Sequence, residues 1–416
     1  MTTSPTAAQT DENAATLASG IPRPTRREKP GFARRDLLFY GLLAGIAILC
    51  SLVYAAVSLG RYDHFQTGED LGLFGEAVRS YADFSAPLSA LKAQGSFNLL
   101  GDHFTPIIAA LAPFYKLWPD VRLLLVAQAL LFGATAAAIG LACRSQLRPW
   151  AGLLVAGAFG LSWGVVEAAA YDFHETAFAV PFLAFALLAA RARRWRVLWI
   201  FCGLLWLTKE DMTFFTAGLA LTLLAQKQVR QAAALAAASV TVFAVLVWGV
   251  IPRLSFYGRY TYFSVVADET MAASVARHLS TPAFWVYLAA LAVTAGLGLL
   301  SPLALAGLPV IASRLVSSDD AYLSFGFHYN ATLMTVCFIA LADGWARWRR
   351  DPGQGTLNPS LRWRRAAAGG GWRQSRTLAG CPRLAPQRRL RAGCLVDRRG
   401  AGLAGRSRGP RPRGGQ

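Results

Sequence analysis

Long runs of residues without a charged side chain constrain the fold of this chain more than any other feature. Residues 37–60, 231–251 and 282–313 contain no Asp, Glu, Lys or Arg, and 123–142 has Gln128 as its only strongly polar side chain. The hydrocarbon core of a bilayer is about 30 Å thick, and a helix of roughly 20 apolar residues crosses it. Each run is therefore long enough to span a membrane. The last is long enough for two short passes, and we expect it to break near Ser301-Pro302.

Further uncharged runs are shorter but still fit a membrane. They cover 150–166, 176–190, 197–208, 212–225 and 329–342. Only 16% of all residues are charged, against about 25% in a soluble domain. The sequence thus predicts an all-α fold, a polytopic transmembrane helical bundle with about nine to eleven membrane segments.

The distribution of basic residues predicts how the bundle is oriented. Short loops rich in Lys and Arg mark the cytoplasmic side. The loops 143–149, 191–196 and 226–230 carry basic residues and no acid. The arm before the first span is also basic, with Arg23, Arg26, Arg27, Lys29, Arg34 and Arg35. All histidines fall on the opposite side (His64, His103, His174, His278 and His328). We expect a multipass protein of the cell membrane with a cytoplasmic N-terminus.

This orientation predicts two local structures in the chain. Residues 197–225 must form a tight helical hairpin with Lys209-Glu210-Asp211 at its outer tip. The apolar stretch 104–117, interrupted by Pro106 and Pro113, must be re-entrant or interfacial. The predicted domains are a disordered cytoplasmic arm (1–35), a transmembrane domain (36–345) and an Arg/Gly-rich tail (346–416) that is also predicted to be disordered.

The composition of the carboxyl tail differs from that of the rest of the chain. Residues 351–416 have a formal charge of +13 (15 Arg less 2 Asp), which leaves +6 of the total of +19 for residues 1–350. A basic arm for anionic lipid or nucleic acid is one interpretation. The tail contains no Lys at all beside its arginines. That bias favours out-of-frame translation of GC-rich DNA, so no nucleic-acid partner is predicted.

The first external loop, roughly 61–103, contains the first candidate catalytic group. Around Asp70 the apolar residues Leu71, Phe74, Val78 and Tyr81 recur at helical spacing. Asp70 is therefore expected near the start of a helix on the outer surface, where the helix dipole favours its carboxylate. A carboxylate at an apolar boundary can bind a cation or act as a general base. An ordinary acidic helix cap in a solvated loop is the alternative.

Ionisable residues cluster at three more places that border apolar runs. They are Tyr171-Asp172-Phe173-His174-Glu175, Lys209-Glu210-Asp211 and Phe327-His328-Tyr329. Such groups are costly beside hydrocarbon and mark candidate functional sites. Charges paired across interfacial loops are the structural alternative. A divalent metal held by Asp102, His103, His174 and Glu175 is conceivable, although no fixed ligand spacing supports it. No other cofactor is predicted.

Several of these motifs occur together in order. They are Glu69-Asp70-Leu71-Gly72-Leu73-Phe74, Gly101-Asp102-His103-Phe104-Thr105-Pro106, Phe173-His174-Glu175, Lys209-Glu210-Asp211 and Phe327-His328-Tyr329. In this the chain resembles an uncharacterised family of bacterial and archaeal multipass membrane proteins, a domain of unknown function that looks related to the GT-C glycosyltransferases. Those enzymes take sugars from polyprenyl-phosphate donors at the outer surface, with an essential acid in the first external loop. The resemblance covers roughly residues 40–345 and places Asp70, with Glu69 beside it, at that acid.

The function expected from this resemblance is sugar transfer from a polyprenyl-phosphate donor at the extracytoplasmic face. Asp70 and Glu69 would be catalytic. The residues expected to bind substrate are Asp102, His103, His174, Glu175, Lys209, Glu210 and His328. Lys209 or an external arginine such as Arg259 would bind the leaving phosphate. A transporter or flippase and a non-catalytic membrane protein are the alternatives. The near absence of charge in the middle of the spans disfavours ion-coupled transport.

Overall fold

The computed structural model describes residues 34–93, 97–263 and 270–350, and every structural statement below refers to these ranges. Its α-helices are α2 (Arg34–Asp63), α3 (Glu69–Ala82), α4 (Ala90–Ala93), α5 (Ala112–Leu117), α6 (Arg122–Arg144), α7 (Pro149–Gly160), α8 (Trp163–Ala170), α9 (Thr176–Ala192), α10 (Trp195–Trp206), α11 (Met212–Ala225), α12 (Val229–Ala244), α13 (Ile251–Leu254), α15 (Met271–Ser280), α16 (Pro282–Ala295), α17 (Leu308–Leu315) and α18 (Ala331–Arg350). Nearly all of the predicted arm and tail lies outside the described residues.

Short elements join these helices. The 3-10 turns are η1 (Leu99–Gly101), η2 (Pro106–Leu111), η4 (Thr261–Phe263), η5 (Gly296–Leu300), η6 (Pro302–Gly307) and η7 (Asp320–Leu323), and η3 (Val245–Val250) is a π-helical turn between α12 and α13. Two-residue strands β1 (Leu88–Ser89) and β2 (Phe97–Asn98) pair antiparallel, with Leu88 opposite Asn98.

The helix lengths confirm a polytopic all-α membrane bundle. In the described part of the chain, four helices are long and apolar enough to cross a membrane, namely 36–63, 122–144, 229–254 and 282–300, and the bent pair α7–α8 can make a fifth span. Shorter apolar helices, such as α9, α10 and α11, occupy other predicted segments. In hydrocarbon a helix satisfies its own backbone hydrogen bonds, which is why apolar runs of this length become helices.

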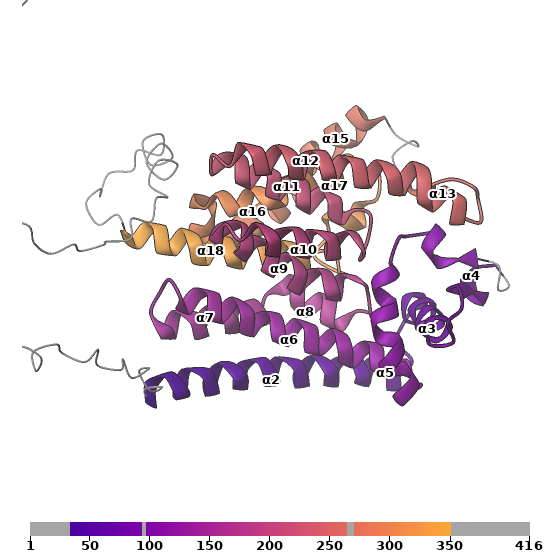
Figure 1. The fold of residues 1–416 in the computed structure, drawn as a ribbon, viewed down its shortest axis with the longest axis horizontal. Helices are drawn as coiled ribbons and strands as arrows, with labels where there is room; N and C mark the ends of the chain where they lie inside the picture. Colours follow the sequence, from indigo (N-terminus) through magenta and orange to yellow (C-terminus); the bar gives the residue numbers. More distant parts are fainter. Residues whose placement is uncertain (1–33, 94–96, 264–269, 351–416) are drawn as a thin grey trace, which may run out of the picture. The chain divides into compact units, whose positions relative to one another are not determined.

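Several long helices lie side by side and bury a common core. The axes of helices α2, α6, α9, α12 and α18 lie nearly parallel to one another, with neighbours such as α2 and α6 antiparallel, whereas α3 is seen almost end-on (Figure 1). Helix α9 lies against α6, α10 and α18, and its residues Ala179, Leu183 and Leu187 are completely buried. On α2, in contrast, Leu38, Leu49 and Leu52 are each more than half exposed. An outward face of this kind suits contact with lipid rather than water.

The expected break in the run 282–313 is present at Ser301. The hydroxyl of Ser301 donates a hydrogen bond to Asp343 Oδ2 at 2.7 Å and accepts one from the backbone N–H of Leu303 at 3.2 Å. The predicted hairpin over 197–225 is also present, because α10 and α11 are joined by residues 207–211 alone. Both predictions are confirmed as local structure.

The two ends of the bundle differ in chemistry. At one end, Arg144 pairs with Asp36, and Asp343 pairs with Arg191 at 2.8 Å and with Arg347 at 2.5 Å. We call this the basic end. The opposite end, to the right in Figure 1, carries α3, α4, α5 and α13, and we call it the site end. Every sequence-predicted site residue lies in α3 or in a loop at the site end.

Candidate functional site

A buried aspartate fixes the start of α3, the helix that carries Asp70. Asp172, in the loop between α8 and α9, accepts hydrogen bonds from the backbone N–H of Gly68 at 2.8 Å and of Leu71 at 3.3 Å. Free N–H groups at a helix start need such partners, and a carboxylate there also complements the helix dipole. Asp172 thus binds α3 to the loop that contains His174. The sequence identified this loop but not the role of Asp172.

Asp70 lies at the second position of α3 and faces that loop. Its Oδ2 accepts a hydrogen bond from the Tyr171 hydroxyl at 3.2 Å and lies 3.7 Å from His174 Nε2. Burial alone would raise the pKa of Asp70, but the hydrogen bond and charge of His174 outweigh it and lower that pKa. The lowered pKa keeps the Asp70 carboxylate ionised. About 31% of its side chain is exposed, so the carboxylate is also open to a ligand.

His174 continues into a buried chain of charges. Its Nδ1 lies 2.5 Å from Glu175 Oε2, and Glu175 Oε1 lies 3.3 Å from Lys209 Nζ. Burial disfavours all three charged forms, but the attraction between the opposite charges is the larger effect. The pKa of Glu175 is consequently held well below its ordinary value, while the pKa of His174 is raised and that of Lys209 is raised further. Buried charges in proteins require such pairing.

His328 adds a second imidazole to this group. Its ring stacks on that of His174 with centroids 3.4 Å apart and an interplanar angle of 15°, and Phe74 contacts the His174 ring edge-on at 5.2 Å. Burial, followed by the positive charge of His174, lowers the pKa of His328 well below its ordinary value. His328 is therefore neutral, and its buried Nδ1 has no hydrogen-bond partner among the described residues. We call Asp70, His174, Glu175, Lys209 and His328 the primary cluster.

A second group of polar side chains surrounds Glu210. Its Oε1 lies 2.6 Å from His103 Nδ1 and accepts a hydrogen bond from the Tyr260 hydroxyl at 3.1 Å, while Oε2 accepts one from the backbone N–H of Phe104 at 3.0 Å. Burial would raise the pKa of Glu210, but the charge and hydrogen bond of His103 lower it. Tyr262 stacks on His103 at 4.2 Å and donates to Asp102, which pairs with Lys92 at 2.6 Å. We call Asp102, His103, Glu210, Tyr260 and Tyr262 the secondary cluster.

A glycine allows the loop of the secondary cluster to dock. A Cβ atom at Gly101 would collide with the backbone of Leu254 and Ser255, so only glycine permits this approach. The approach places Asp102 and His103 beside the loop that carries Tyr260 and Tyr262. The sequence did not predict either tyrosine. The run of aromatic residues that directly follows the span 229–254 was the signal available.

The hairpin tip between α10 and α11 connects the two clusters. Lys209 contacts Glu175 in the primary cluster, whereas its neighbour Glu210 contacts His103 in the secondary cluster. The next residue, Asp211, has a buried Oδ1 without a hydrogen-bond partner among the described residues, and burial, together with neighbouring acids, raises its pKa. The residues predicted from separate motifs are thus gathered at one end of the bundle.

Three sequence expectations receive less support. Glu69 is exposed, and no hydrogen bond or ion pair joins its side chain to another described residue. Arg259 is also exposed and has no ion pair within the described ranges. The four residues considered for a metal are divided between the two clusters, and no group of three or more His, Cys, Asp or Glu with suitable geometry occurs in the part of the chain that the structure describes.

One buried cation was not predicted at all. Arg314, near the end of α17, is 8% exposed and donates hydrogen bonds to the Tyr287 hydroxyl at 2.9 Å and to Asn330 Oδ1 at 3.0 Å. It also donates to the backbone carbonyl of Tyr329, next to His328, at 2.5 Å. A single arginine at the end of an apolar run resembles an ordinary helix end in the sequence.

Comparison with known proteins matches the chain to a family. The model of a family described as predicted membrane protein (DUF2079) matches residues 61–368. This range includes both clusters and helices α3 to α18. No curated protein and no solved structure matches the chain significantly.

Proposed function

This chain belongs to the DUF2079 family of predicted membrane proteins, and we propose that it is a GT-C-like glycosyltransferase of the cell membrane. It transfers a sugar from a polyprenyl-phosphate donor to an acceptor hydroxyl at the extracytoplasmic face, and its N-terminus is cytoplasmic. The observation that carries the proposal is the state of Asp70. This carboxylate is ionised and partly exposed, at the edge of a buried charge network at one end of a membrane bundle.

In this mechanism Asp70 acts as the general base. The acceptor oxygen forms a bond to the anomeric carbon while the bond from that carbon to the phosphate oxygen breaks, and the hydroxyl proton passes to Asp70 Oδ2. Polyprenyl phosphate leaves with the bonding electrons. A low pKa makes Asp70 a weak base toward a free hydroxyl. Transfer becomes favourable as the attacking oxygen gains positive charge in the transition state, and such catalysis contributes typically about 10²–10⁴-fold.

The other members of the primary cluster position Asp70 and tune its charge. Protonated His174 keeps the carboxylate ionised, and Glu175 in turn keeps the proton on His174. Lys209 is paired with Glu175, so in this proposal it organises the site. In the secondary cluster, His103 and Asp102 lie within one loop that can contact the acceptor or the sugar.

The test is an Asp70→Asn variant of the full chain, reconstituted in liposomes with a polyprenyl-phosphate sugar and a soluble acceptor. We expect transfer to fall by about 10²-fold or more, because the amide cannot accept the proton. Asp83→Asn, which removes an exposed carboxylate just after the last residue of α3, is the matched control and should retain activity. Unchanged turnover in Asp70→Asn would remove Asp70 from the mechanism. Movement of the lipid across the bilayer without transfer would support the flippase alternative.

A further inference from the structure

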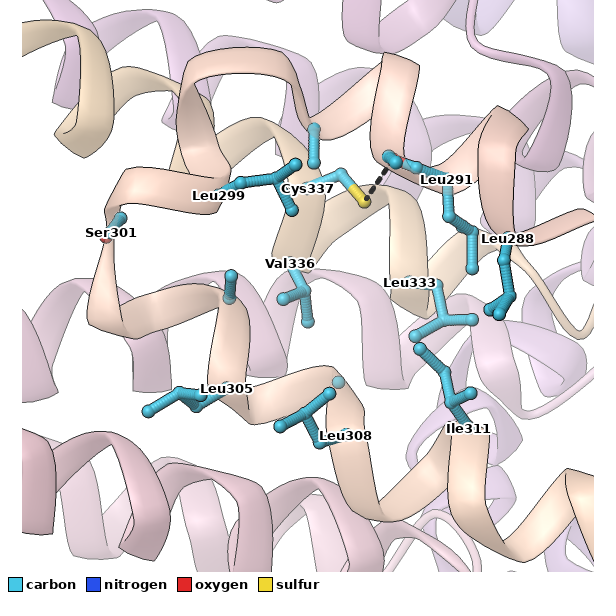
Figure 2. Close-up of a pocket in the computed structure, with 14 residues that line it drawn as sticks. Leu288, Leu291, Leu299, Ser301, Leu305, Leu308, Ile311, Leu333, Val336 and Cys337 are labelled. Carbon is cyan, nitrogen blue, oxygen red and sulfur yellow. Dashed lines mark hydrogen bonds between the residues drawn. The ribbon is translucent and has the colours of Figure 1, made fainter. Parts of the chain in front are cut away.

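An apolar groove lies between α16, α17 and α18, and no member of the primary or secondary cluster lines it. Its volume is about 300 Å³. Aliphatic side chains line it, including Leu288, Leu308, Leu333 and Val336, and they point into the space between the three segments (Figure 2). Ser301 and Cys337 are the polar exceptions in the lining, and Cys337 Sγ faces the Leu291 carbonyl at 4.0 Å. The groove is therefore suited to hydrocarbon.

Arg314 and its partners lie one helical turn beyond one end of this groove. Arg314 follows the lining residue Ile311 by three positions on α17, and Asn330 precedes the lining residue Leu333 by three positions. Tyr287 directly precedes Leu288 on α16. Residues three apart on a helix are neighbours on its surface, so Arg314 lies next to Ile311, and its hydrogen bonds hold Tyr287 and Asn330 beside it. The hydrogen-bonded group Arg314–Tyr287–Asn330 thus bounds the groove on the side opposite Ser301.

The charge of Arg314 is not neutralised inside the described protein. Its hydrogen-bond acceptors are a hydroxyl, an amide and a backbone carbonyl, all uncharged, and no Asp or Glu of the described ranges forms an ion pair with it. At the basic end, in contrast, Arg191 and Arg347 share Asp343. A buried cation without a carboxylate partner is costly beside hydrocarbon, and ionisable residues in such places mark candidate ligand sites.

We propose that the groove binds the hydrocarbon chain of the lipid-linked donor and that Arg314 binds its phosphate. The inference rests on the proposed function and identifies the donor-binding part of the same site. Both halves of such a ligand have a counterpart here. The apolar groove takes hydrocarbon, and one helical turn from its lining residue Ile311 lies Arg314, a cation without an acidic partner among the described residues. The volume lies at the low end for ligand pockets, so it holds a segment of one chain rather than a whole lipid.

Contacts connect this position to the catalytic carboxylate. Arg314 holds the Tyr329 carbonyl, and the Tyr329 ring lies 4.3 Å from that of His328. His328 stacks on His174, which faces Asp70. A phosphate bound at Arg314 would therefore place its sugar on the side of the bundle where the primary cluster lies. Lys209 does not offer this combination, because it is already paired, and Arg259 is exposed.

Two tryptophan substitutions at neighbouring positions of α16 test the groove. Ala292 lines it, whereas Val293 is 81% exposed on the outside of the bundle. Binding of a photoactivatable polyprenyl phosphate is measured by crosslinking to the full-length protein in nanodiscs, apart from any sugar transfer. Ala292→Trp should weaken binding roughly tenfold or more, since excluding two methylene groups costs about that much. Val293→Trp should bind like the wild type.

The phosphate contact is tested with Arg314→Gln in the same assay, together with thermal unfolding. We expect weaker binding of polyprenyl phosphate but unchanged binding of the uncharged polyprenol. Equal binding by Ala292→Trp and wild type overturns the proposal, as does equal competition by phosphatidylglycerol, which would indicate an ordinary lipid site. A dimer that only Ala292→Trp dissociates would assign the groove to a second copy. Donor binding without sugar transfer would refute the proposed function but not the donor-binding site.

Discussion

The imidazole rings of His174 and His328 lie face to face with their centroids 3.4 Å apart. Two protonated rings at this distance would repel each other strongly in a buried site. The carboxylates of Asp70 and Glu175 both lie near His174, so the proton resides there and His328 stays neutral. The two rings therefore differ in protonation, and the charged ring, that of His174, lies beside the candidate base Asp70.

This asymmetry predicts a pH optimum of stability. The pKa of His174 is raised by its carboxylate neighbours against the effect of burial, so its contribution is complete below the unfolded-state pKa of about 6.5 and is lost as pH rises through the folded-state value. The pKa of His328 is lowered, by burial first and then by His174, so its contribution is present above about 6.5 and is lost as pH falls.

Thermal unfolding of the detergent-solubilised protein between about pH 5 and 9 measures the loss of stability on both the acid and the alkaline side. His328→Phe should remove the loss on the acid side and leave the loss on the alkaline side. His64→Asn changes an exposed histidine and serves as the control, which should lose stability on both sides as the wild type does. If His328→Phe still loses stability as the pH falls, the assignment of His328 as the neutral ring is wrong.

The buried pair of Glu175 and Lys209 predicts strong energetic coupling. Lys209→Met would leave Glu175 without its lysine partner in a buried site, and such changes cost about 3–5 kcal/mol of unfolding free energy. The double variant Lys209→Met, Glu175→Gln should recover part of this loss, because the orphaned charge is gone. A double-mutant cycle by denaturant or thermal unfolding gives the coupling.

The pair of Arg277 and Asp320, which is far more exposed than that of Lys209 and Glu175, provides the comparison for that cycle. The Asp320 side chain is 75% exposed, so removing it should cost only about 0–1 kcal/mol. If the losses of Lys209→Met and Glu175→Gln simply add, the two side chains do not act as a buried pair.

Most of the helical architecture follows from the sequence, because a bilayer leaves an apolar run few alternatives to a helix. The break at Ser301-Pro302 and the hairpin with Lys209 at its tip were predictable for this reason. The helical start near Asp70 followed from apolar periodicity and is confirmed in α3. That separate motifs share one end of the bundle followed from the alternation of spans.

The partners within the site were not predictable, because they depend on tertiary approach between distant segments. Asp172 caps a helix that begins about a hundred residues earlier, and nothing local distinguishes it from Glu175. Tyr260 contacts Glu210 across 50 positions, and Gly101 lets the loop of His103 pack against the backbone of Leu254 and Ser255. Arg314 resembles a helix end in the sequence, and only its surroundings show that none of the described acids pairs with it.

The close approach at Gly101 gives a prediction for the secondary cluster. Gly101→Ala would force the loop away from Leu254, which should separate His103 from Glu210 and cost about 1–3 kcal/mol of stability. Gly157→Ala is a matched control, because its added Cβ meets nothing within 4 Å inside helix α7. That control should be neutral or slightly stabilising. Thermal unfolding distinguishes them, and equal behaviour of the two variants would show that the loop adapts without cost.

The orientation proposed for the membrane can be tested by labelling single cysteines in a background without the six native ones. Phe65 and Phe84 are both more than 90% exposed at the site end, and Arg193 is exposed at the basic end, so each accepts a reagent without unfolding. His174 is a poor reporter because it is buried. If the basic loops face the cytoplasm, a membrane-impermeant maleimide added to intact cells labels positions 65 and 84 and reaches 193 only after lysis. The opposite pattern would place Asp70 on the cytoplasmic side and exclude a donor bound at the outer face.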